Sequence, residues 1–546
     1  STVGASARKI KCFKGKAFFS FSSIEDAKNA IAELNNLEIK GKKLLAKYAR
    51  PEPLKGHDRS LSCEYVLDKN KNEDSKTIAR LCVTPLADLP YDEQLRQKLN
   101  QSEKLLSSLV KQLDNASVTS FKPLLLKQRL EPIRPSPRII GYRNKCEFTV
   151  GESTDGSLEV GFVKGKFAEN QHYVVPIDNC PNISDQMKRI VAYFKEFITD
   201  TGYPPFNEFN REGVWRMLTI REFGCDVMII ATVFPMKQIK DEEVLKKNFS
   251  EKFLNPINFF EKRFRVTSVY WQRLENASDE VIYEHIGGAR YIYETILDSR
   301  FRVSPGAFFQ TNTAAAEVLY STILEKFMSI EENSVGDTAD DSTVKTFEKA
   351  DDLLSDSPEF QKKKPKFLCS NERKHTLLLD ICCGTGTIGV CILSSLKRKK
   401  MDENVFLLGI ELVEAAVKDA LHNAHDNFLF EKQCCFIAGE ASAIFQSING
   451  ILPPNMHLED SEVIGILDPP RSGVHDSVIL GCRTLSNMKH LIYVSCHPSM
   501  ASKNLTDLCR PTSKKYAGKP FHIESIVPVD MFPQTIHCEW VIKLCR

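Results

Sequence analysis

The last third of the chain repeats a hydrophobic pattern in which an apolar run ends in an acid or a small residue. Residues 377–379 are all leucine, Asp380 follows them, a Cys-Cys-Gly-Thr-Gly stretch comes next, and apolar positions resume at Ile388. This pattern predicts a buried parallel strand, a tight loop and a helix. Gly384 and Gly386 lack a Cβ, so the backbone can turn sharply and a ligand can approach closely. A lone Gly-x-Gly is equally compatible with a plain strand–helix turn.

Three more apolar runs follow in alternation with helical patterns, which predicts a Rossmann-like α/β domain over residues 312–546. Residues 405–411 end in Glu411, residues 463–468 end in Asp468, and residues 490–496 end in Cys496. The carboxyl ends of parallel strands share one edge of a sheet, where nucleotide-like ligands bind. An isolated cysteine is usually inert and buried, but Cys496 is expected at this edge.

Residues 138–311 show mostly strand-like patterns and predict a central β-rich domain. The expected strands cover 145–150, 159–164, 215–222, 227–234, 266–272 and 290–296. Arg143 and Lys145 stand at a strand entrance, where they either contact RNA phosphates or belong to a solvated turn. Phe308 is one of two adjacent aromatics, and by itself it is compatible with the core or with a stacking surface.

The first 137 residues contain two weaker patterns. Residues 1–53 resemble the second half of an RNA-recognition motif, with a strand at 14–21 and a helix at 24–34, and Phe18 matches a base-stacking position. A small α+β domain in which the phenylalanines form a core is the alternative. Residues 54–137 are expected to form a linker and a long helix at 91–113, whose leucines face the core or a partner helix. An acidic stretch at 331–366 predicts a disordered insertion.

Composition limits the classes of protein. A chain of 546 residues predicts about three domains, and a net charge of +2 excludes a global polycation. The 17 cysteines lack Cys-x-x-Cys spacing, so neither a disulfide framework nor a metal site is indicated, and a reducing nuclear or cytosolic location is expected. No apolar run approaches a membrane span, and no signal peptide is visible. The chain starts at Ser1 without Met, so a fragment or processed form is expected.

Six motifs occur in one order: Tyr-Arg-Asn-Lys at 142–145, Phe-Phe-Gln at 308–310, Asp-x-x-Cys-Gly-x-Gly at 380–386, Asp-Pro-Pro-Arg at 468–471, Ser-Cys-x-Pro at 495–498 and His-x-Glu at 537–539. This ordered set resembles the family of S-adenosylmethionine-dependent RNA uracil-C5 methyltransferases. The iron–sulfur cysteines of the rRNA-modifying branch are absent, which favours tRNA over rRNA, and the resemblance then implies the T-loop uridine at position 54 as the target. Cys382 stands where the bacterial tRNA enzymes have an aromatic residue, so this chain departs from the family pattern at that cofactor contact.

The resemblance implies a role for each matching residue. Cys496 would be the nucleophile that adds to uracil C6, and Glu539 the base that removes the C5 proton. Phe308 would support the extruded target base. The cofactor would be S-adenosyl-L-methionine, with contacts from Gln310, Asp380, Gly384, Gly386, Glu411 and Asp468. The implied partner is tRNA, with no membrane or metal, and we expect a monomer.

Two other functions stay open at this stage. Asp-Pro-Pro also resembles a motif of methyltransferases that modify exocyclic amines of nucleic acids, although Arg471 and Cys496 argue against that class. The second alternative is an RNA-binding protein or tRNA chaperone with little catalysis. An intact pair of Cys496 and Glu539 argues against an idle catalytic domain.

Overall fold

The computed structural model describes residues 7–13, 16–21, 24–35, 37–39, 42–43, 45–46, 75–118, 128–164, 173–207, 210–236, 238–274, 281–336 and 375–546. They form two compact units, one containing the described residues up to Ala46 and the other those from Ser75 onward. In this part of the chain, no helix is long and apolar enough to cross a bilayer.

The first unit contains the predicted strand and helix, preceded by a strand that the sequence analysis did not predict. Strand β1 (Ala7–Phe13) pairs antiparallel with β2 (Lys16–Phe21), helix α1 (Ile24–Asn35) follows, and β3 (Glu38–Ile39) pairs with β4 (Lys42–Lys43). Phe18 lies in β2 opposite Lys11, but its side chain is outside the described parts of the structure. Its predicted stacking role therefore stays a prediction.

The second unit contains a central seven-stranded sheet in the order β11-β10-β9-β8-β5-β6-β7. Its strands are β5 (Lys145–Glu152), β6 (Leu158–Lys164), β7 (Tyr173–Val175), β8 (Trp215–Phe223), β9 (Asp226–Val233), β10 (Ser268–Arg273) and β11 (Glu284–Gly288). Neighbours are antiparallel except β9 and β10, which are parallel. Five of the expected strands coincide with strands of this sheet within a few residues.

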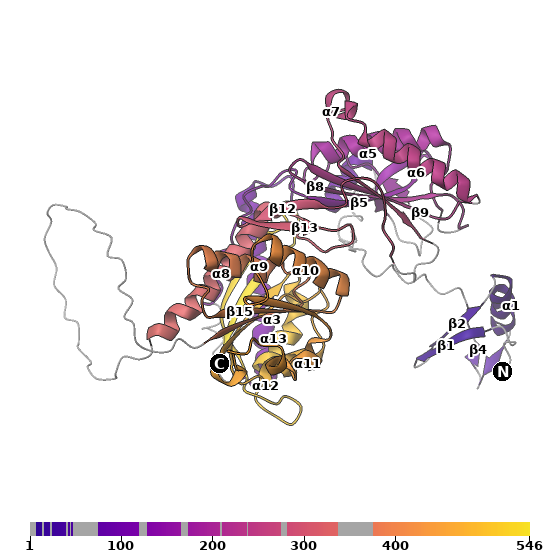
Figure 1. Cartoon of the computed structure of the whole chain (residues 1–546). Helices are drawn as coiled ribbons and strands as arrows, with labels where there is room; N and C mark the ends of the chain where they lie inside the picture. Colours follow the sequence, from indigo (N-terminus) through magenta and orange to yellow (C-terminus); the bar gives the residue numbers. More distant parts are fainter. Residues whose placement is uncertain are drawn as a thin grey trace, which may run out of the picture. The chain divides into compact units, whose positions relative to one another are not determined.

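Two helices that the strand-dominated prediction for residues 138–311 did not include cover this sheet, α5 (Asp185–Thr201) and α6 (Ile239–Leu254) (Figure 1). The short α7 (Ile257–Glu261) follows α6, and α2 (Ser75–Val83), in the stretch expected to be a linker, contacts β7. Helix α5 begins after Ser184, whose side chain accepts a hydrogen bond from the Met187 amide, and ends at Gly202 with φ 70°. Phe194 and Phe249 from α5 and α6 pack with Trp215 of the sheet.

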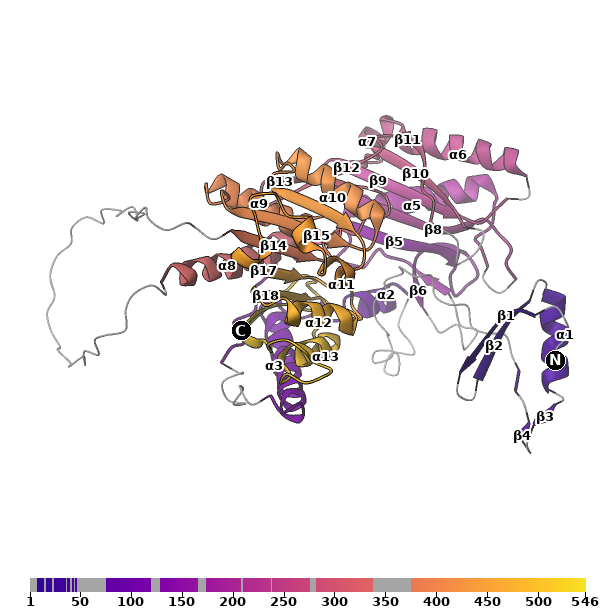
Figure 2. The same ribbon diagram turned by 60° about the horizontal axis from the view of Figure 1, so that its bottom comes forward.

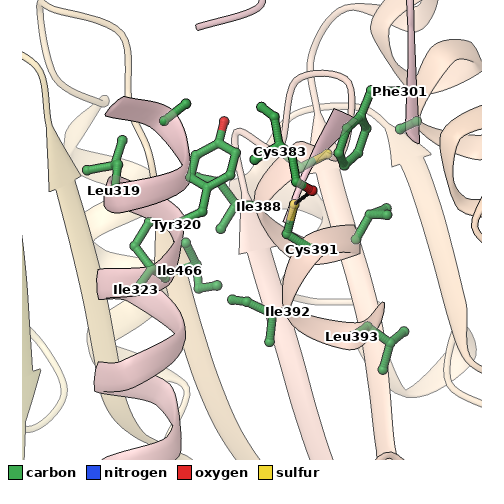
Figure 3. Packing of buried hydrophobic residues seen from close by; sticks show 14 of the residues in the cluster. Phe301, Leu319, Tyr320, Ile323, Cys383, Ile388, Cys391, Ile392, Leu393 and Ile466 are labelled. Carbon is green, nitrogen blue, oxygen red and sulfur yellow. Dashed lines mark hydrogen bonds between the residues drawn. The ribbon is translucent and has the colours of Figure 1, made fainter. Parts of the chain in front are cut away.

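A hairpin and a long helix join the central sheet to the last domain. Strands β12 (Ile292–Ile296) and β13 (Ser299–Val303) pair antiparallel, and α8 (Thr313–Gly336) follows. Leu319, Tyr320 and Ile323 of α8 lie opposite Ile388 and Ile392 in one hydrophobic core (Figure 3). The predicted insertion at 331–366 begins too early, because residues 331–336 continue α8 to a terminal glycine. Residues 337–374 lie outside the described parts of the chain.

The last domain has a seven-stranded sheet in the order β16-β15-β14-β17-β18-β20-β19, which confirms the Rossmann-like prediction. Its strands are β14 (Thr376–Ile381), β15 (Val405–Glu411), β16 (Cys434–Ala438), β17 (Glu462–Leu467), β18 (Met488–Ser495), β19 (His522–Val529) and β20 (Glu539–Cys545). The first five are parallel, and β20 pairs antiparallel with both β18 and β19.

Both faces of this sheet are covered. Leu378 belongs to one core, whereas Leu377 and Leu379 belong to the other, as expected for a strand buried on both sides. The helices are α9 (Thr387–Arg398), α10 (Glu414–Asp426), α11 (Ala441–Ile444), α12 (Asp476–Thr484) and α13 (Pro498–Cys509), with short 3-10 turns η3 (Ile448–Gly450) and η4 (Leu458–Asp460).

Helix α3 (Tyr91–Asn115) also belongs to this domain, although it precedes the central sheet in the sequence. Its C-terminal half contributes Leu106, Leu109 and Leu113 to the second core, and it lies beside α13 (Figure 2). The predicted helix is therefore confirmed, and it packs on the sheet formed by strands β14 to β20. In its first half the buried residues are polar rather than the expected leucines, since Leu95 and Leu99 are only partly buried.

Candidate active site

The loop after β14 has the backbone conformation that its small residues permit. Cys382, Gly384 and Gly386 have φ of 63°, 55° and 76°, all in the left-handed region. A Cβ at Gly386 would lie 2.9 Å from a ring carbon of Phe436, so this position requires glycine. A Cβ at Gly384 would meet nothing within 4 Å. The loop therefore packs tightly at Gly386 and has open space at Gly384.

Glu411 ends β15 beside this loop, and two backbone amides fix its carboxylate. Its Oε2 accepts a hydrogen bond from the Gly384 amide at 3.0 Å, and its Oε1 accepts one from the Val413 amide at 3.0 Å. Each oxygen keeps a lone pair that can accept a ligand hydroxyl. Leu412 and Val413, which follow directly, are 74% and 55% exposed. An oriented carboxylate and a small apolar surface thus lie side by side.

Asp380 lies beneath the loop rather than on its surface. The side chain is buried, and its Oδ2 accepts a hydrogen bond from the Gly389 amide at 3.0 Å. Its Oδ1 is buried without a partner among the described residues. Burial raises the pKa of Asp380 to about 7. Asp380 therefore supports the start of α9 and the loop, and it reaches a ligand only through them.

The strand pairing brings Cys496 and Glu539 together. Ser495 of β18 pairs with Trp540 of β20 in antiparallel register. The residue after Ser495 and the residue before Trp540 are therefore neighbours at the carboxyl edge of the sheet, and these are Cys496 and Glu539. Glu539 is only 2% exposed.

Asp468 joins this pair from the adjacent strand. Leu467 of β17 pairs with Tyr493 of β18, and Asp468 follows Leu467 directly. Burial raises the pKa of Asp468 to about 7, and the charge of Asp380 adds to that rise. The predicted residues Asp468, Cys496 and Glu539 thus converge on one edge, as their positions at strand ends required.

The electrostatics of the three groups are coupled. Burial raises the pKa of Glu539 to about 8, and the negative charge of Asp468 contributes. Burial also raises the pKa of the Cys496 thiol to about 12, with further contributions from Glu539 and Asp468. Arg471 lowers the pKa of both groups. The free protein thus holds a thiol next to a carboxyl group that titrates near neutral pH.

Arg471 is a site residue to which the sequence analysis gave no role. It belongs to the Asp-Pro-Pro-Arg motif, and the two prolines hold the backbone extended between Asp468 and Arg471. Its guanidinium is the cation that acts on both Cys496 and Glu539. The Asp-Pro-Pro-Arg motif could have revealed this role. Arg471 is only three residues after Asp468, so it lies at the same sheet edge.

The Phe-Phe-Gln stretch splits into one exposed and two buried residues. Phe308 is 70% exposed, whereas Phe309 is buried against Phe223 at a ring-centroid distance of 5.3 Å. Gln310 is buried, and its carbonyl accepts a hydrogen bond from the Asn144 side chain at 2.9 Å. Phe308 is therefore a surface aromatic and not part of the core.

The Tyr-Arg-Asn-Lys stretch has a largely structural environment. The Tyr142 hydroxyl donates to the Pro533 carbonyl at 3.0 Å, which ties the central domain to the loop before Glu539. The Arg143 Nε donates to the Lys145 carbonyl at 3.3 Å. Lys145 forms an ion pair with Glu147 at 2.9 Å. RNA contact by Arg143 and Lys145 stays a prediction.

The donor set at the sheet edge suits S-adenosylmethionine. Glu411 presents carboxylate oxygens for two ribose hydroxyls, Leu412 and Val413 present apolar surface for a purine ring, and Gly384 leaves space for close approach. Asp468 supplies a carboxyl group close enough to Cys496 to raise the pKa of its thiol. Within the described residues, no cluster of three or more His, Cys, Asp or Glu is placed to hold a metal ion.

The chain is similar in sequence to known proteins. The family model described as tRNA (Uracil-5-)-methyltransferase matches residues 366–546. Mouse (Mus musculus) tRNA (uracil-5-)-methyltransferase homolog A is 33% identical over 563 residues, covering 100% of this chain and 80% of that protein. Human (Homo sapiens) tRNA (uracil-5-)-methyltransferase homolog B is 32% identical over 478 residues, covering 85% of this chain and 83% of that protein.

A solved structure has the same fold. The Pyrococcus abyssi tRNA (uracil-54, C5)-methyltransferase in complex with S-adenosyl-L-homocysteine has a TM-score of 0.53 to this chain, with 22% identity and 84% of each chain covered. Together with sequence identity that extends over the whole chain, these matches show that the chain belongs to the tRNA (uracil-5-)-methyltransferase family, whose members are S-adenosylmethionine-dependent enzymes.

Proposed function

We propose that this protein methylates C5 of the T-loop uridine of tRNA, with S-adenosylmethionine as methyl donor, Cys496 as nucleophile and Glu539 as base. The observation that carries the proposal is the pairing of Ser495 with Trp540, which makes Cys496 and Glu539 neighbours. Transfer to an exocyclic amine needs no thiol, because the amine is itself the nucleophile. A thiol beside a carboxyl group is what C5 methylation of uracil requires.

The proposed reaction balances as follows. Cys496 gives up its proton to solvent and its sulfur bonds to C6, which breaks the C5–C6 double bond and makes C5 a nucleophilic carbon. S-adenosylmethionine, when bound, would supply the electrophilic methyl group that C5 takes, and S-adenosylhomocysteine would leave. The carboxylate of Glu539 then removes the C5 proton, the C5–C6 double bond forms again and the thiolate leaves. The two protein groups that this sequence of steps requires, Cys496 and Glu539, are neighbours at one sheet edge, which supports the proposal.

The raised pKa values are consistent with these roles. A carboxyl group with a pKa of about 8 is a stronger base than an ordinary glutamate and titrates near the working pH. The pKa of Cys496 is raised, so its thiolate needs a favourable partner. Arg471 is that partner, since its charge lowers the pKa of the thiol.

The proposed RNA substrate follows from the relatives and from the exposed aromatic. The relatives' names specify tRNA and uracil, and the archaeal neighbour's title specifies uracil-54. A uridine in a folded loop must leave its stack to reach the partly buried Cys496 thiol, and Phe308, which is 70% exposed, offers it a new stacking surface. The cations Arg143 and Lys145 would contact the phosphates of the same RNA.

Methylation of defined transcripts tests the proposal. Purified protein is incubated with S-adenosylmethionine and a tRNA transcript, and methyluridine is located by nuclease digestion and mass spectrometry. We expect one 5-methyluridine, in the T loop, and none in a transcript whose T-loop uridine is replaced by cytidine. A methyl group found on an exocyclic amine would refute the proposal. Absence of any methylation by protein that binds S-adenosylmethionine would refute it as well.

A further inference from the structure

Helix α3 carries a row of buried polar side chains that contact the hairpin formed by β19 and β20. Residues 530–540 of this hairpin include the proposed base, Glu539. Gln94, Lys98 and Ser102 recur every four residues and are 4%, 1% and 1% exposed. Steps of four continue to Leu106 and Val110, so one helix face is polar in its first half and apolar in its second. We call Tyr91, Gln94, Lys98 and Ser102 the α3 polar row. Buried polar groups at this spacing need partners, and each of them finds one between residues 530 and 540.

The strongest contact of the row is a buried ion pair. The Lys98 Nζ lies 2.5 Å from the Asp530 Oδ1, with side chains that are 1% and 0% exposed. The same ammonium donates to the Phe532 carbonyl at 2.9 Å, and the Tyr91 hydroxyl donates to the Asp530 Oδ2 at 2.9 Å. Burying two charges brings a large desolvation cost, so such a pair is a weak source of stability. A function that requires one fixed geometry explains it better than stability does.

The remaining contacts hold the same hairpin on both sides of the proposed base. The Gln94 Oε1 accepts a hydrogen bond from the Gln534 amide at 2.7 Å, and Gln534 has a strained φ of 69°. The Ser102 Oγ accepts one from the Trp540 Nε1 at 3.1 Å. Trp540 follows Glu539 directly, and Asp530 follows Val529, which is the strand partner of Glu539. The row thus fixes two residues that border Glu539, one along the chain and one across the strands.

The same face of α3 reaches the nucleophile. A cavity of about 80 Å³ lies between α3 and the sheet edge, and Lys98, Ser102, Cys496, His537 and Trp540 are among its lining residues. Helix α3 therefore forms one wall of the cavity that Cys496 also lines. Movement of α3 would change both the position of the hairpin and the enclosure of the site.

We propose that the α3 polar row positions Glu539 for removal of the C5 proton, so that a helix preceding the central domain belongs to the catalytic apparatus. This inference rests on the proposed function. Lys98 is a positioning residue, because it contacts Asp530 and Phe532 and not the reacting atoms. Cys496 is delivered by β18, which lies outside the 530–540 hairpin. Loss of Lys98 should therefore slow proton removal more than it slows formation of the adduct.

The test separates these two steps in single turnovers. The tRNA carries tritium at uracil C5, so release of tritium into water measures proton removal, and a slow-migrating band on a denaturing gel measures the covalent adduct. Lys98→Met should form the adduct at a rate within about threefold of the wild type and release tritium roughly 10- to 100-fold more slowly, so that the band accumulates. Lys104→Met changes an exposed lysine of the same helix and should behave like the wild type.

Milder variants keep the test valid if Lys98→Met does not fold. Tyr91→Phe removes one donor to Asp530, and Lys98→Met combined with Asp530→Asn removes the unpaired charge. Both should retain adduct formation and slow tritium release. Equal slowing of both steps, or no difference from Lys104→Met, would overturn the positioning role. Absence of adduct and of tritium release in the wild type would instead refute the proposed function.

Discussion

Glu539 lies next to Cys496 because β20 runs antiparallel to β18, with Ser495 paired to Trp540. The first five strands of the sheet are parallel, and their carboxyl ends deliver Asp380, Glu411, Asp468 and Cys496 to one edge. A further parallel strand would deliver another carboxyl end there. The antiparallel β20 instead delivers its first residue, so an acid at the start of a strand meets a cysteine at the end of another.

Replacing Cys496 and replacing Glu539 should stop the reaction at different steps. Cys496→Ala should form no covalent adduct with tRNA, because the sulfur that bonds to C6 is missing. Glu539→Gln should add and methylate, and then stay attached to the RNA, because an amide cannot take the C5 proton. Denaturing gels with labelled tRNA measure both results directly.

A 5-fluorouridine tRNA supplies the control for that experiment. Wild-type protein should form a stable adduct with it, since fluorine cannot leave as a cation. A methyltransferase of exocyclic amines, or an RNA chaperone with an idle catalytic domain, should form no adduct with any of these substrates. An adduct that persists in Cys496→Ala would contradict the assigned nucleophile.

The pH dependence of proton removal should follow Glu539. Burial and Asp468 raise its pKa to about 8, and the carboxylate is the active form, so tritium release should rise with pH and level off above about pH 8. Asp468→Asn removes a nearby negative charge and should move the midpoint to lower pH, whatever it does to the maximal rate. An unchanged midpoint in this variant would show that another group limits the step.

Glu411 should contribute to cofactor affinity through its oriented oxygens. Glu411→Ala should weaken binding of S-adenosylmethionine by about 1.5–3 kcal/mol, as for hydrogen bonds to a charged group. Glu414→Ala removes an exposed carboxylate nearby, which pairs with Lys418 at 2.8 Å, and should leave the affinity unchanged. Calorimetry on folded variants decides this, and equal affinities for both variants would remove Glu411 from the site.

Replacing Phe308 should affect tRNA binding, whereas replacing its neighbour Phe309 should affect stability. Phe308→Ala should raise the KM for tRNA with little change in unfolding, because its ring is exposed. Phe309→Ala should lower the free energy of unfolding by about 3–5 kcal/mol, because its ring packs against Phe223 in the core. Thermal melts and steady-state kinetics compare them. A strongly destabilised Phe308→Ala would show that this ring packs in the folded protein.

The sequence predicted the residues at the sheet edge because strand ends leave a local signal. Asp468 and Cys496 each terminate an apolar run, and Glu539 belongs to a short motif. The α3 polar row left no such signal, because Gln94 and Lys98 are residues that usually face solvent. Their burial depends on Asp530 and Gln534, which lie more than 400 residues away in the sequence.

The helices of the central domain were missed for a related reason. Met187, Ile190 and Phe194 have helical spacing, but they lie among runs whose β-branched and aromatic residues favour strands. The packing of α5 on the central sheet decides the outcome, and that depends on strands from both sides of the helix in the sequence. Likewise, Phe308 and Phe309 are identical in type, and only the fold distinguishes the exposed ring from the buried one.

Asp380 should make the stability of the free protein fall as pH rises. Its pKa is raised from 3.8 to about 7 by burial, so between these values the folded protein binds more protons than the unfolded chain. The free energy of unfolding therefore decreases with pH across this window. Asp380→Asn keeps an oxygen for the Gly389 amide and has no charge to bury. It should be more stable than the wild type at pH 8, on the order of 1–3 kcal/mol, and similar at pH 4.

Asp476 is the matched control for that measurement. Lys503 lowers the pKa of Asp476, so its contribution is present at neutral pH and is lost as the pH falls. Asp476→Asn should therefore bring no gain in stability at pH 8. Melting temperatures of the three proteins between pH 4 and 8, without cofactor, test the difference. If Asp380→Asn lowers the melting temperature equally at pH 4 and pH 8, ionisation of Asp380 does not destabilise the folded protein. Its pKa is then not raised by burial.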